Sequence, residues 1–205
     1  MTDPKALFDD RCALVVVDVQ NDFAHPDGGL YVEGGHDVVP AVNFLVGAAL
    51  AVRAVVAYTQ DWHPPATPHF ETHGGVWPVH CIQGTWGAEL HPDLDVEGPI
   101  VRKGAGDDDG YSGFFARDLA TGEDRATELQ AVLHDHEVDR VVVVGLAQDV
   151  CVKATALDAR RLGYETTVVL GAIRPVNVSP GDDRRAIADM VDAGIAVIGD
   201  PERQE

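Results

Sequence analysis

Short runs of apolar, β-branched residues recur along this chain and alternate with longer segments of helical pattern. The runs cover residues 13–19, 54–59, 99–103, 141–145, 166–170 and 195–199. Helical patterns precede the second, fourth, fifth and sixth runs, over residues 36–52, 122–136, 152–163 and 181–194. Continuous apolar runs are typical of strands buried on both faces. Their alternation with helices predicts an α/β fold, with a doubly wound, mostly parallel six-stranded sheet and helices on both faces.

Composition narrows the class of protein. With 205 residues, 45% of them hydrophobic, the chain can bury a full core, so we expect residues 1–205 to form a single domain. A net charge of −19 disfavours nucleic acid and anionic membrane surfaces as partners. The apolar run near the N-terminus is too short to span a bilayer and lacks a signal pattern, which predicts a cytoplasmic protein. The odd number of cysteines, Cys12, Cys81 and Cys151, favours reduced thiols over a disulfide framework.

The longest segment without a strand or helix pattern covers residues 60–98, and loops of this length usually carry function. Four possible metal ligands lie at its start, Asp61, His63, His69 and His80. A carboxylate with imidazoles suits zinc, iron(II) or manganese better than calcium or magnesium, and favours an open catalytic or substrate-binding site. We therefore predict a metal-binding loop insertion at about 60–98. His69 is either a ligand, a residue that orients a bound water, or a plain loop histidine.

Several polar residues stand where predicted strands end, the edge at which open parallel sheets bind ligands. Asp18 follows an apolar run, where a carboxylate is costly unless it is paired or functional, so a general base with a raised pKa is expected. Cys151 lies two positions after Asp149, a candidate N-cap, so its thiol is expected in the first turn of a helix that lowers its pKa. Each residue also has a purely structural interpretation. Cys151 could be a buried, unreactive cysteine, and Asp18 a hydrogen-bonded aspartate that caps the strand edge.

The third predicted strand ends at Lys103, one of only three lysines in a chain with twelve arginines. A compact ammonium suits a position between a carboxylate and a thiol better than a forked guanidinium does. The acidic run Asp107, Asp108 and Asp109 follows shortly after this strand. We interpret that run as a solvated turn in preference to a cation site.

Six motifs, taken together, resemble the nicotinamidases, also called pyrazinamidases, among the isochorismatase-like cysteine hydrolases. They are VVVDVQNDF (15–23), TQDWH (59–63), WPVHCIQGTWGAELHP (77–92), VRKG (101–104), YSGF (111–114) and GLAQDVCVKATALDA (145–159). The resemblance extends from about residue 12 to 199, with the motifs in the family's order. It implies a metal-dependent amidohydrolase of pyridine nucleotide salvage that deamidates nicotinamide to nicotinic acid and ammonia through a thioester acyl-enzyme. Pyrazinamide is an expected second substrate.

The resemblance also implies roles for individual residues. The catalytic triad would be Asp18, Lys103 and Cys151, and a cis peptide between Leu146 and Ala147 would shape an oxyanion hole made by the amides of Ala147 and Cys151. Phe23, Trp77 and Tyr111 would flank the substrate ring. One divalent metal ion is implied, zinc first and iron or manganese as alternatives, with the ligands Asp61, His63 and His80, and His69 in some members.

Two segments depart from the family pattern, which leaves the shape of the pocket open. AQDVC (147–151) lacks a threonine common after the alanine, and AGDDDG (105–110) lacks an aromatic residue found in some members. A carbamoyl or ureido amidohydrolase of the same superfamily is the main alternative, and a non-catalytic metal-binding protein is another. An isochorismate hydrolase is disfavoured because it needs no thiol at position 151. A small-molecule substrate is the expected partner, and a homo-oligomer is left open.

Overall fold

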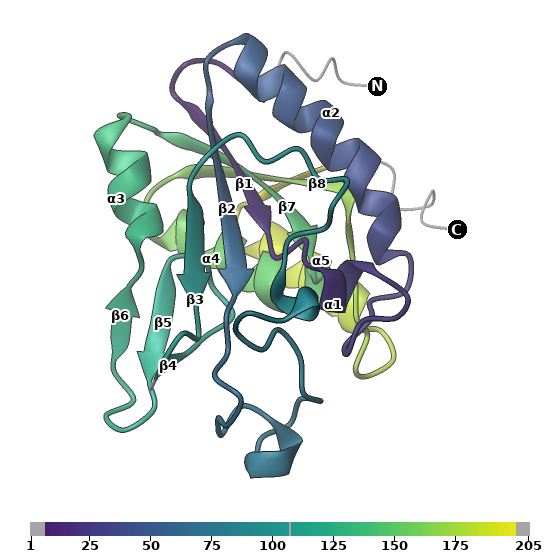
Figure 1. Ribbon diagram of the computed structural model, residues 1–205. Coiled ribbons are helices and arrows are strands. Elements are labelled where there is room, and N and C mark those ends of the chain that lie inside the picture. Colours follow the sequence, from purple (N-terminus) through teal and green to yellow (C-terminus); the bar gives the residue numbers. More distant parts are fainter. Residues whose placement is uncertain (1–6, 107, 200–205) are drawn as a thin grey trace.

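A six-stranded parallel sheet forms the centre of the protein, as the computed structural model shows for residues 7–106 and 108–199 (Figure 1). The strand order is β3-β2-β1-β7-β8-β9, and every neighbouring pair is parallel. The strands are β1 (Cys12–Val17), β2 (Val55–Asp61), β3 (Ile100–Lys103), β7 (Arg140–Leu146), β8 (Glu165–Arg174) and β9 (Ala196–Ile198). The predicted doubly wound sheet is therefore confirmed.

Helices cover both faces of this sheet (Figure 1). Helix α2 (Val38–Ala51) packs on one face, with the short α1 (Asn21–Ala24) near the carboxyl ends of the strands. Helices α3 (Glu128–Asp135), α4 (Lys153–Arg161) and α5 (Asp182–Asp192) pack on the other. A 3₁₀ turn, η2 (Gly35–Asp37), leads into α2. Among the described residues, no helix is long and apolar enough to cross a membrane.

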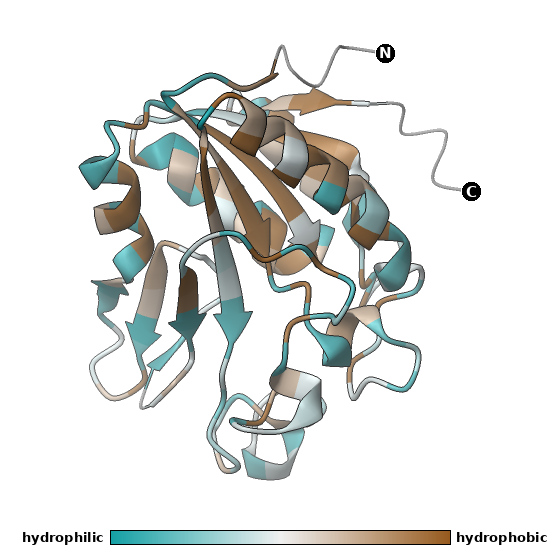
Figure 2. Cartoon of the chain, turned by 45° about the horizontal axis from the view of Figure 1, so that its top comes forward, coloured by the Kyte–Doolittle hydropathy of each residue, from teal (hydrophilic) through white to brown (hydrophobic). Residues whose placement is uncertain are grey.

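Strand β1 shows why the sheet is buried on both sides. All six of its residues are buried, and successive side chains point to opposite faces. Leu14 and Val16 pack in the cluster that includes α2, whereas Ala13 and Val15 pack in the cluster that includes α3, α4 and α5. Figure 2 shows the central strands as hydrophobic along most of their length. Each fully buried Val or Leu contributes about 1.5–3 kcal/mol, so this core holds the carboxyl ends of the strands in fixed positions.

The register of the strands brings the predicted site residues to one edge. The order reverses between β1 and β7, and such a switch point opens a crevice at the carboxyl ends. Asp61 pairs with Lys103 across β2 and β3, and Val17 pairs with Gly145 across β1 and β7. Gly145 has φ 110°, and a Cβ there would lie 2.1 Å from the Val17 carbonyl oxygen. Only glycine allows this approach, which sets Asp18 directly beside the start of the loop after β7.

A second sheet, antiparallel and three-stranded, was not predicted. It consists of β4 (Asp108–Asp109), β5 (Phe115–Asp118) and β6 (Asp124–Ala126), in that order. The helix predicted over 122–136 is therefore wrong at its start, because β6 pairs with β5 and α3 begins only at Glu128. Thr127 caps α3, since its Oγ1 accepts a hydrogen bond from the Leu129 amide at 3.2 Å.

The long segment between β2 and β3 folds below the carboxyl ends of the strands (Figure 1). It contains the 3₁₀ helices η3 (Glu71–His73) and η4 (Trp86–Ala88). Two side chains of the VVVDVQNDF motif hold it in place. The Gln20 amide donates to the carbonyls of Asp61 and Ala88 at 2.8 and 2.9 Å. The Asp22 carboxylate accepts from the Cys81 amide at 2.6 Å, so the segment that carries the candidate metal ligands is tied to the sheet.

Candidate active site

Three ionisable side chains from separate segments of the chain meet at the crevice: Asp18 after β1, Lys103 at the end of β3, and Cys151 after β7. The Lys103 Nζ atom lies 2.9 Å from Asp18 Oδ2 and 3.6 Å from Cys151 Sγ. All three residues are buried. One ammonium thus joins a carboxylate and a thiol in a site screened from solvent, where their electrostatic interactions are strong.

Asp18 follows β1 in a left-handed backbone conformation, with φ 47°. The Thr59 hydroxyl donates a hydrogen bond to its Oδ1 at 2.6 Å. Burial raises the pKa of Asp18 to about 6, although the charge of Lys103 opposes this shift. The raised pKa expected from the sequence is confirmed, and the carboxylate is ionised at neutral pH.

Lys103 is paired with a second carboxylate, because its Nζ also contacts Asp61 Oδ1. The Gly110 carbonyl is a further acceptor at 3.5 Å. Burial alone would lower the pKa of Lys103, but Asp18 and Asp61 outweigh it and raise that pKa well above its ordinary value. The ammonium therefore stays charged while it is buried between two carboxylates.

Cys151 lies within a π-helical turn, η5 (Gln148–Val152), that continues into α4. The N-cap prediction for Asp149 is wrong, because its carboxylate accepts hydrogen bonds from the amides of Val176 and Asn177 at 2.9 and 2.8 Å. The expected lowering of the thiol pKa is also wrong. Burial raises the pKa of Cys151 well above its ordinary value, while Lys103 opposes the shift. The resting thiol is protonated and needs a base.

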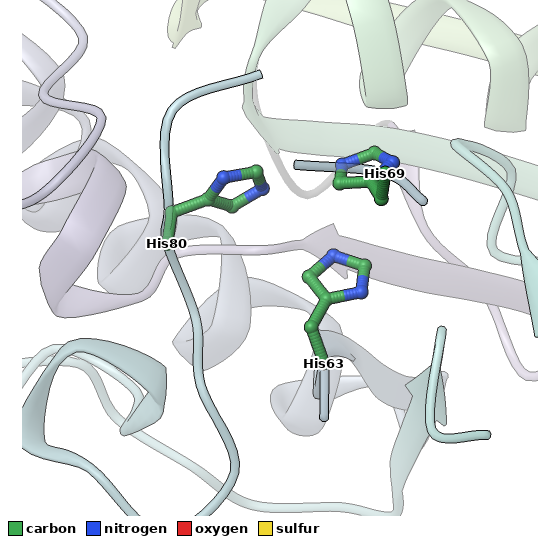
Figure 3. Close-up of side chains that lie close together, drawn as sticks. All are labelled: His63, His69 and His80. Atoms are coloured by element: carbon green, nitrogen blue, oxygen red, sulfur yellow. The ribbon is translucent and has the colours of Figure 1, made fainter. Parts of the chain in front are cut away.

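Three imidazoles from the loop between β2 and β3 point toward one another, those of His63, His69 and His80 (Figure 3). Their possible ligand atoms lie within 4.8 Å of one another, and all three residues are buried. Nδ1 of His69 meets Asp109 Oδ2 at 2.8 Å, and Nδ1 of His80 meets the Pro78 carbonyl at 2.6 Å. Because both acceptors fix the proton on Nδ1, the Nε2 atom of each ring is free to bind a metal ion.

The chemistry of this cluster fits a divalent metal ion. Among the described residues, none is a hydrogen-bond partner for the buried Nε2 atom of His63. Burial lowers the pKa of His63 to about 4, so the ring is neutral at neutral pH. An unpaired buried nitrogen is costly, whereas several neutral imidazoles form a donor set that zinc prefers. Asp61 adjoins the cluster, with Oδ2 3.9 Å from His63 Nε2, and links it to Lys103.

A cavity lies between the histidine cluster and Cys151, since His69, His80 and Cys151 all line it. The three aromatic residues named from the sequence, Phe23, Trp77 and Tyr111, all line it, as does Ala147. The Trp77 indole donates to the Tyr111 hydroxyl at 3.0 Å, which joins two loops at the wall of the cavity. The peptide between Leu146 and Ala147 is cis, as the resemblance implied. The oxyanion-hole role of the amides of Ala147 and Cys151 remains a prediction.

Asp109 lies beside the histidine cluster, a position that was not predicted from the sequence. Its run was interpreted as a solvated turn, yet Asp109 Oδ2 meets His69, and only 24% of the Asp109 side chain is exposed. Asp107 lies outside the described residues. In sequence, Asp109 lies between Lys103 and Tyr111, both predicted site residues, and this proximity was the one available signal. The hydroxyl of Thr59 donates a hydrogen bond to Asp18. In the sequence, only the position of Thr59, two residues before Asp61, could have suggested that it lies in the site.

Comparisons with known proteins place the chain in a family. An isochorismatase domain is identified over residues 12–201. The chain is 37% identical over 207 residues to the nicotinamidase of Escherichia coli K12, covering 89% of this chain and 92% of that protein. Its structure is similar to that of the pyrazinamidase of Pyrococcus horikoshii, which was solved in complex with zinc. The TM-score is 0.82 and the identity 36%, and the match covers 93% of this chain and 99% of that one. An L. infantum protein solved in complex with nicotinate gives a TM-score of 0.83 and 33% identity, over 92% of each chain. The chain therefore belongs to the isochorismatase family.

Proposed function

We propose that this protein hydrolyses the carboxamide of nicotinamide to nicotinic acid and ammonia, and that it accepts pyrazinamide as a second substrate. One observation carries the proposal: the thiol of Cys151, with Lys103 and Asp18 in contact, faces the histidine cluster across a single small cavity. A largely apolar cavity with a few convergent polar groups suits a small aromatic ligand. The similar proteins from E. coli and P. horikoshii carry the names of these two amidase activities.

In the acylation half of the reaction, Asp18 accepts the proton of the Cys151 thiol and Sγ attacks the amide carbon. A C–S bond forms while the carbonyl electron pair moves to oxygen, where the amides of Ala147 and Cys151 donate hydrogen bonds to the oxyanion. Asp18 then returns its proton to the amide nitrogen, the C–N bond breaks and ammonia leaves. A thioester remains on Cys151.

In the deacylation half, a water molecule gives a proton to Asp18 and attacks the thioester carbon. The C–S bond breaks, Asp18 returns the proton to the sulfur, and the carboxylic acid is released. Lys103 stays charged throughout and stabilises the thiolate form of Cys151 whenever the proton resides on Asp18. The same carboxyl group therefore acts alternately as base and acid, which its pKa of about 6 allows near neutral pH.

His63, His69 and His80 would hold one divalent metal ion, with Asp61 as a further ligand. Zinc fits this donor set first, and iron(II) or manganese are the alternatives. When bound, the ion would supply a Lewis-acid site for the ring nitrogen of the substrate. Phe23, Trp77 and Tyr111 line the same cavity and flank the ring.

We also propose that the protein is located in the cytoplasm. All three cysteines, Cys12, Cys81 and Cys151, are buried and unpaired. Free thiols are typical of a reducing compartment. Assembly into a homo-oligomer stays a prediction.

Ammonia release from nicotinamide by the purified protein tests the proposal. We expect release that is lost in Cys151→Ala, retained in Cys12→Ala, and reduced after treatment with a chelator. Cys12 is the matched control because it is also buried but lies at the start of β1, in the core. Unchanged release in Cys151→Ala would contradict the covalent mechanism. If the metal-loaded wild type released no ammonia, nicotinamide would not be its substrate. Other amides and ureido compounds would then be tested.

A further inference from the structure

Asp109 contacts the histidine cluster from outside the loop that carries it. Its Oδ2 atom lies 2.8 Å from Nδ1 of His69, and the His69 side chain is only 5% exposed. A carboxylate only accepts hydrogen bonds, so His69 Nδ1 carries the proton and donates it to Asp109. The lone pair of His69 is consequently on Nε2, the ring atom that remains for another partner.

The small antiparallel sheet sets the position of Asp109. Asp109 belongs to β4 and pairs with Arg117 of β5. Its Oδ1 accepts from the Gly110 amide at 2.7 Å, so the carboxylate is held at one oxygen by backbone and at the other by His69. The Gly110 carbonyl in turn accepts from Lys103 Nζ at 3.5 Å. The segment Asp109–Gly110 thus contacts both His69 of the histidine cluster and Lys103 beside the thiol.

The orientation of the His69 ring needs such an external partner. His69 stacks on His63 with ring centroids 4.5 Å apart, and on Trp77 at 6.4 Å. Stacking fixes the plane of a ring, but a flip about the Cβ–Cγ bond would still exchange Nδ1 with Cδ2 and Nε2 with Cε1. The hydrogen bond to Asp109 removes that ambiguity, because the flipped ring would place a carbon against the carboxylate.

We propose that Asp109 is a positioning residue for a metal ligand: it holds His69 as the Nδ1-protonated tautomer and directs Nε2 to the divalent ion. This inference rests on the proposed metal site. Outer carboxylates that accept from ligating histidines fix their tautomer and raise their basicity, and their removal typically costs about 10- to 100-fold in metal affinity. Asp109 would therefore tighten the site without contacting the ion.

Zinc affinity measured by competition with a chromophoric chelator tests the inference. We expect Asp109→Ala to bind Zn²⁺ about 10- to 100-fold more weakly than the wild type. Asp109→Asn should lie between the two, because it keeps an acceptor and loses the charge. Asp108→Asn is the matched control, since it removes one charge from the neighbouring position of β4, and its affinity should equal that of the wild type.

A double-mutant cycle separates positioning from general support of the loop. In a His69→Ala background, Asp109→Ala should cause no further loss of zinc affinity, since the partner through which it acts is gone. A ¹⁵N–¹H spectrum of the metal-free wild type should show His69 protonated on Nδ1, and Asp109→Ala should change that signal.

Three outcomes would overturn the inference. They are wild-type zinc affinity in Asp109→Ala, an equal loss in the His69→Ala background, and an Nε2-protonated His69 in the wild type. Each of these leaves the proposed amidase standing if the wild type binds zinc and releases ammonia. A wild type that binds no zinc would overturn the inference and the proposed metal site together, while ammonia release would still report separately on the thiol chemistry.

Discussion

The ammonium of Lys103 lies 3.6 Å from the sulfur of Cys151. The same Nζ atom is 2.9 Å from Asp18 and also contacts Asp61, so a single cation serves the thiol, the base and a candidate metal ligand. Because all four side chains are buried, each charge strongly affects the others. The structure therefore couples the protonation of the nucleophile to the metal loop through one lysine.

The pH dependence of hydrolysis should report on Asp18. Its pKa of about 6 is raised above the ordinary value by burial, and only the ionised form can accept the thiol proton. We expect kcat/KM for nicotinamide to fall about tenfold per pH unit as the pH drops below about 6, since this ratio reports the free enzyme. Asp18→Asn should lower activity nearly as far as Cys151→Ala does. A profile that is flat down to pH 4.5, or an active Asp18→Asn, would remove the base from the mechanism.

The raised pKa of Asp18 favours stability at low pH, whereas it lowers activity there. Because folding raises the pKa of Asp18, ionisation costs more in the folded protein than in the unfolded chain. The contribution of this group to the free energy of unfolding is greatest at low pH and is lost as the pH rises through about 6. Urea unfolding of Asp18→Asn, compared with the wild type at pH 5 and pH 7.5, should show a relative gain for the variant at the higher pH. A relative loss there would contradict the raised pKa.

Lys103→Met should destabilise the protein by about 3–5 kcal/mol at neutral pH, because it leaves two buried carboxylates without their cation. Urea unfolding measures the loss, which should shrink at acidic pH as the carboxylates become protonated. Lys153→Met is the matched control, since Lys153 is only partly buried and pairs with the exposed Asp189 at 3.5 Å. That variant should lose about 1 kcal/mol or less. Equal losses in the two variants would contradict the buried network.

His80→Ala should separate the metal site from the thiol. We expect metal content to fall and KM for nicotinamide to rise, since the histidine cluster loses one of three donors. Alkylation of Cys151 by iodoacetamide should continue at a rate within about threefold of that of the metal-free wild type, because Asp18 and Lys103 are untouched. Loss of thiol reactivity with an unchanged fold would mean that the two clusters act as one unit.

Gly104→Ala tests how tightly the backbone packs against the cluster. Gly104 has φ 67°, and a Cβ there would lie 2.5 Å from Cε1 of His63. The left-handed backbone alone should cost about 1–2 kcal/mol, and displacement of His63 should weaken zinc binding in addition. At Gly106, two residues on, a Cβ would meet no atom within 4 Å. Gly106→Ala should therefore keep wild-type zinc affinity, and a similar loss in both variants would contradict the packing argument.

The central sheet could be predicted because its inner strands β1, β2 and β7 are largely apolar and buried almost throughout, which leaves little choice of structure. The strand ends then located Asp18, Asp61 and Lys103, since parallel strands deliver their carboxyl ends to one edge. The loop histidines were found by their density in sequence. The division into a single domain with a metal-binding insertion stays a prediction, as do the roles of the individual site residues.

The rest depends on pairings that leave no local pattern. Strands β4, β5 and β6 are short and rich in charged residues, so 122–127 shows a helical pattern until its pairing with β5 is known. Asp149 precedes a helix, as an N-cap does, but the distant amides of Val176 and Asn177 take its carboxylate. The contact between Asp109 and His69 joins strand β4 to the loop after β2, and no local sequence pattern predicts it.

The proposed mechanism requires Cys151 to form a covalent acyl-enzyme. Intact-protein mass spectrometry after rapid acid quench of a single turnover with nicotinamide can detect this intermediate. We expect a transient species heavier by one nicotinoyl group, mapped by peptide digestion to Cys151 and absent in Cys151→Ala. If ammonia were released during the same turnover but no such adduct appeared at any quench time down to the burst phase, the covalent mechanism would be contradicted.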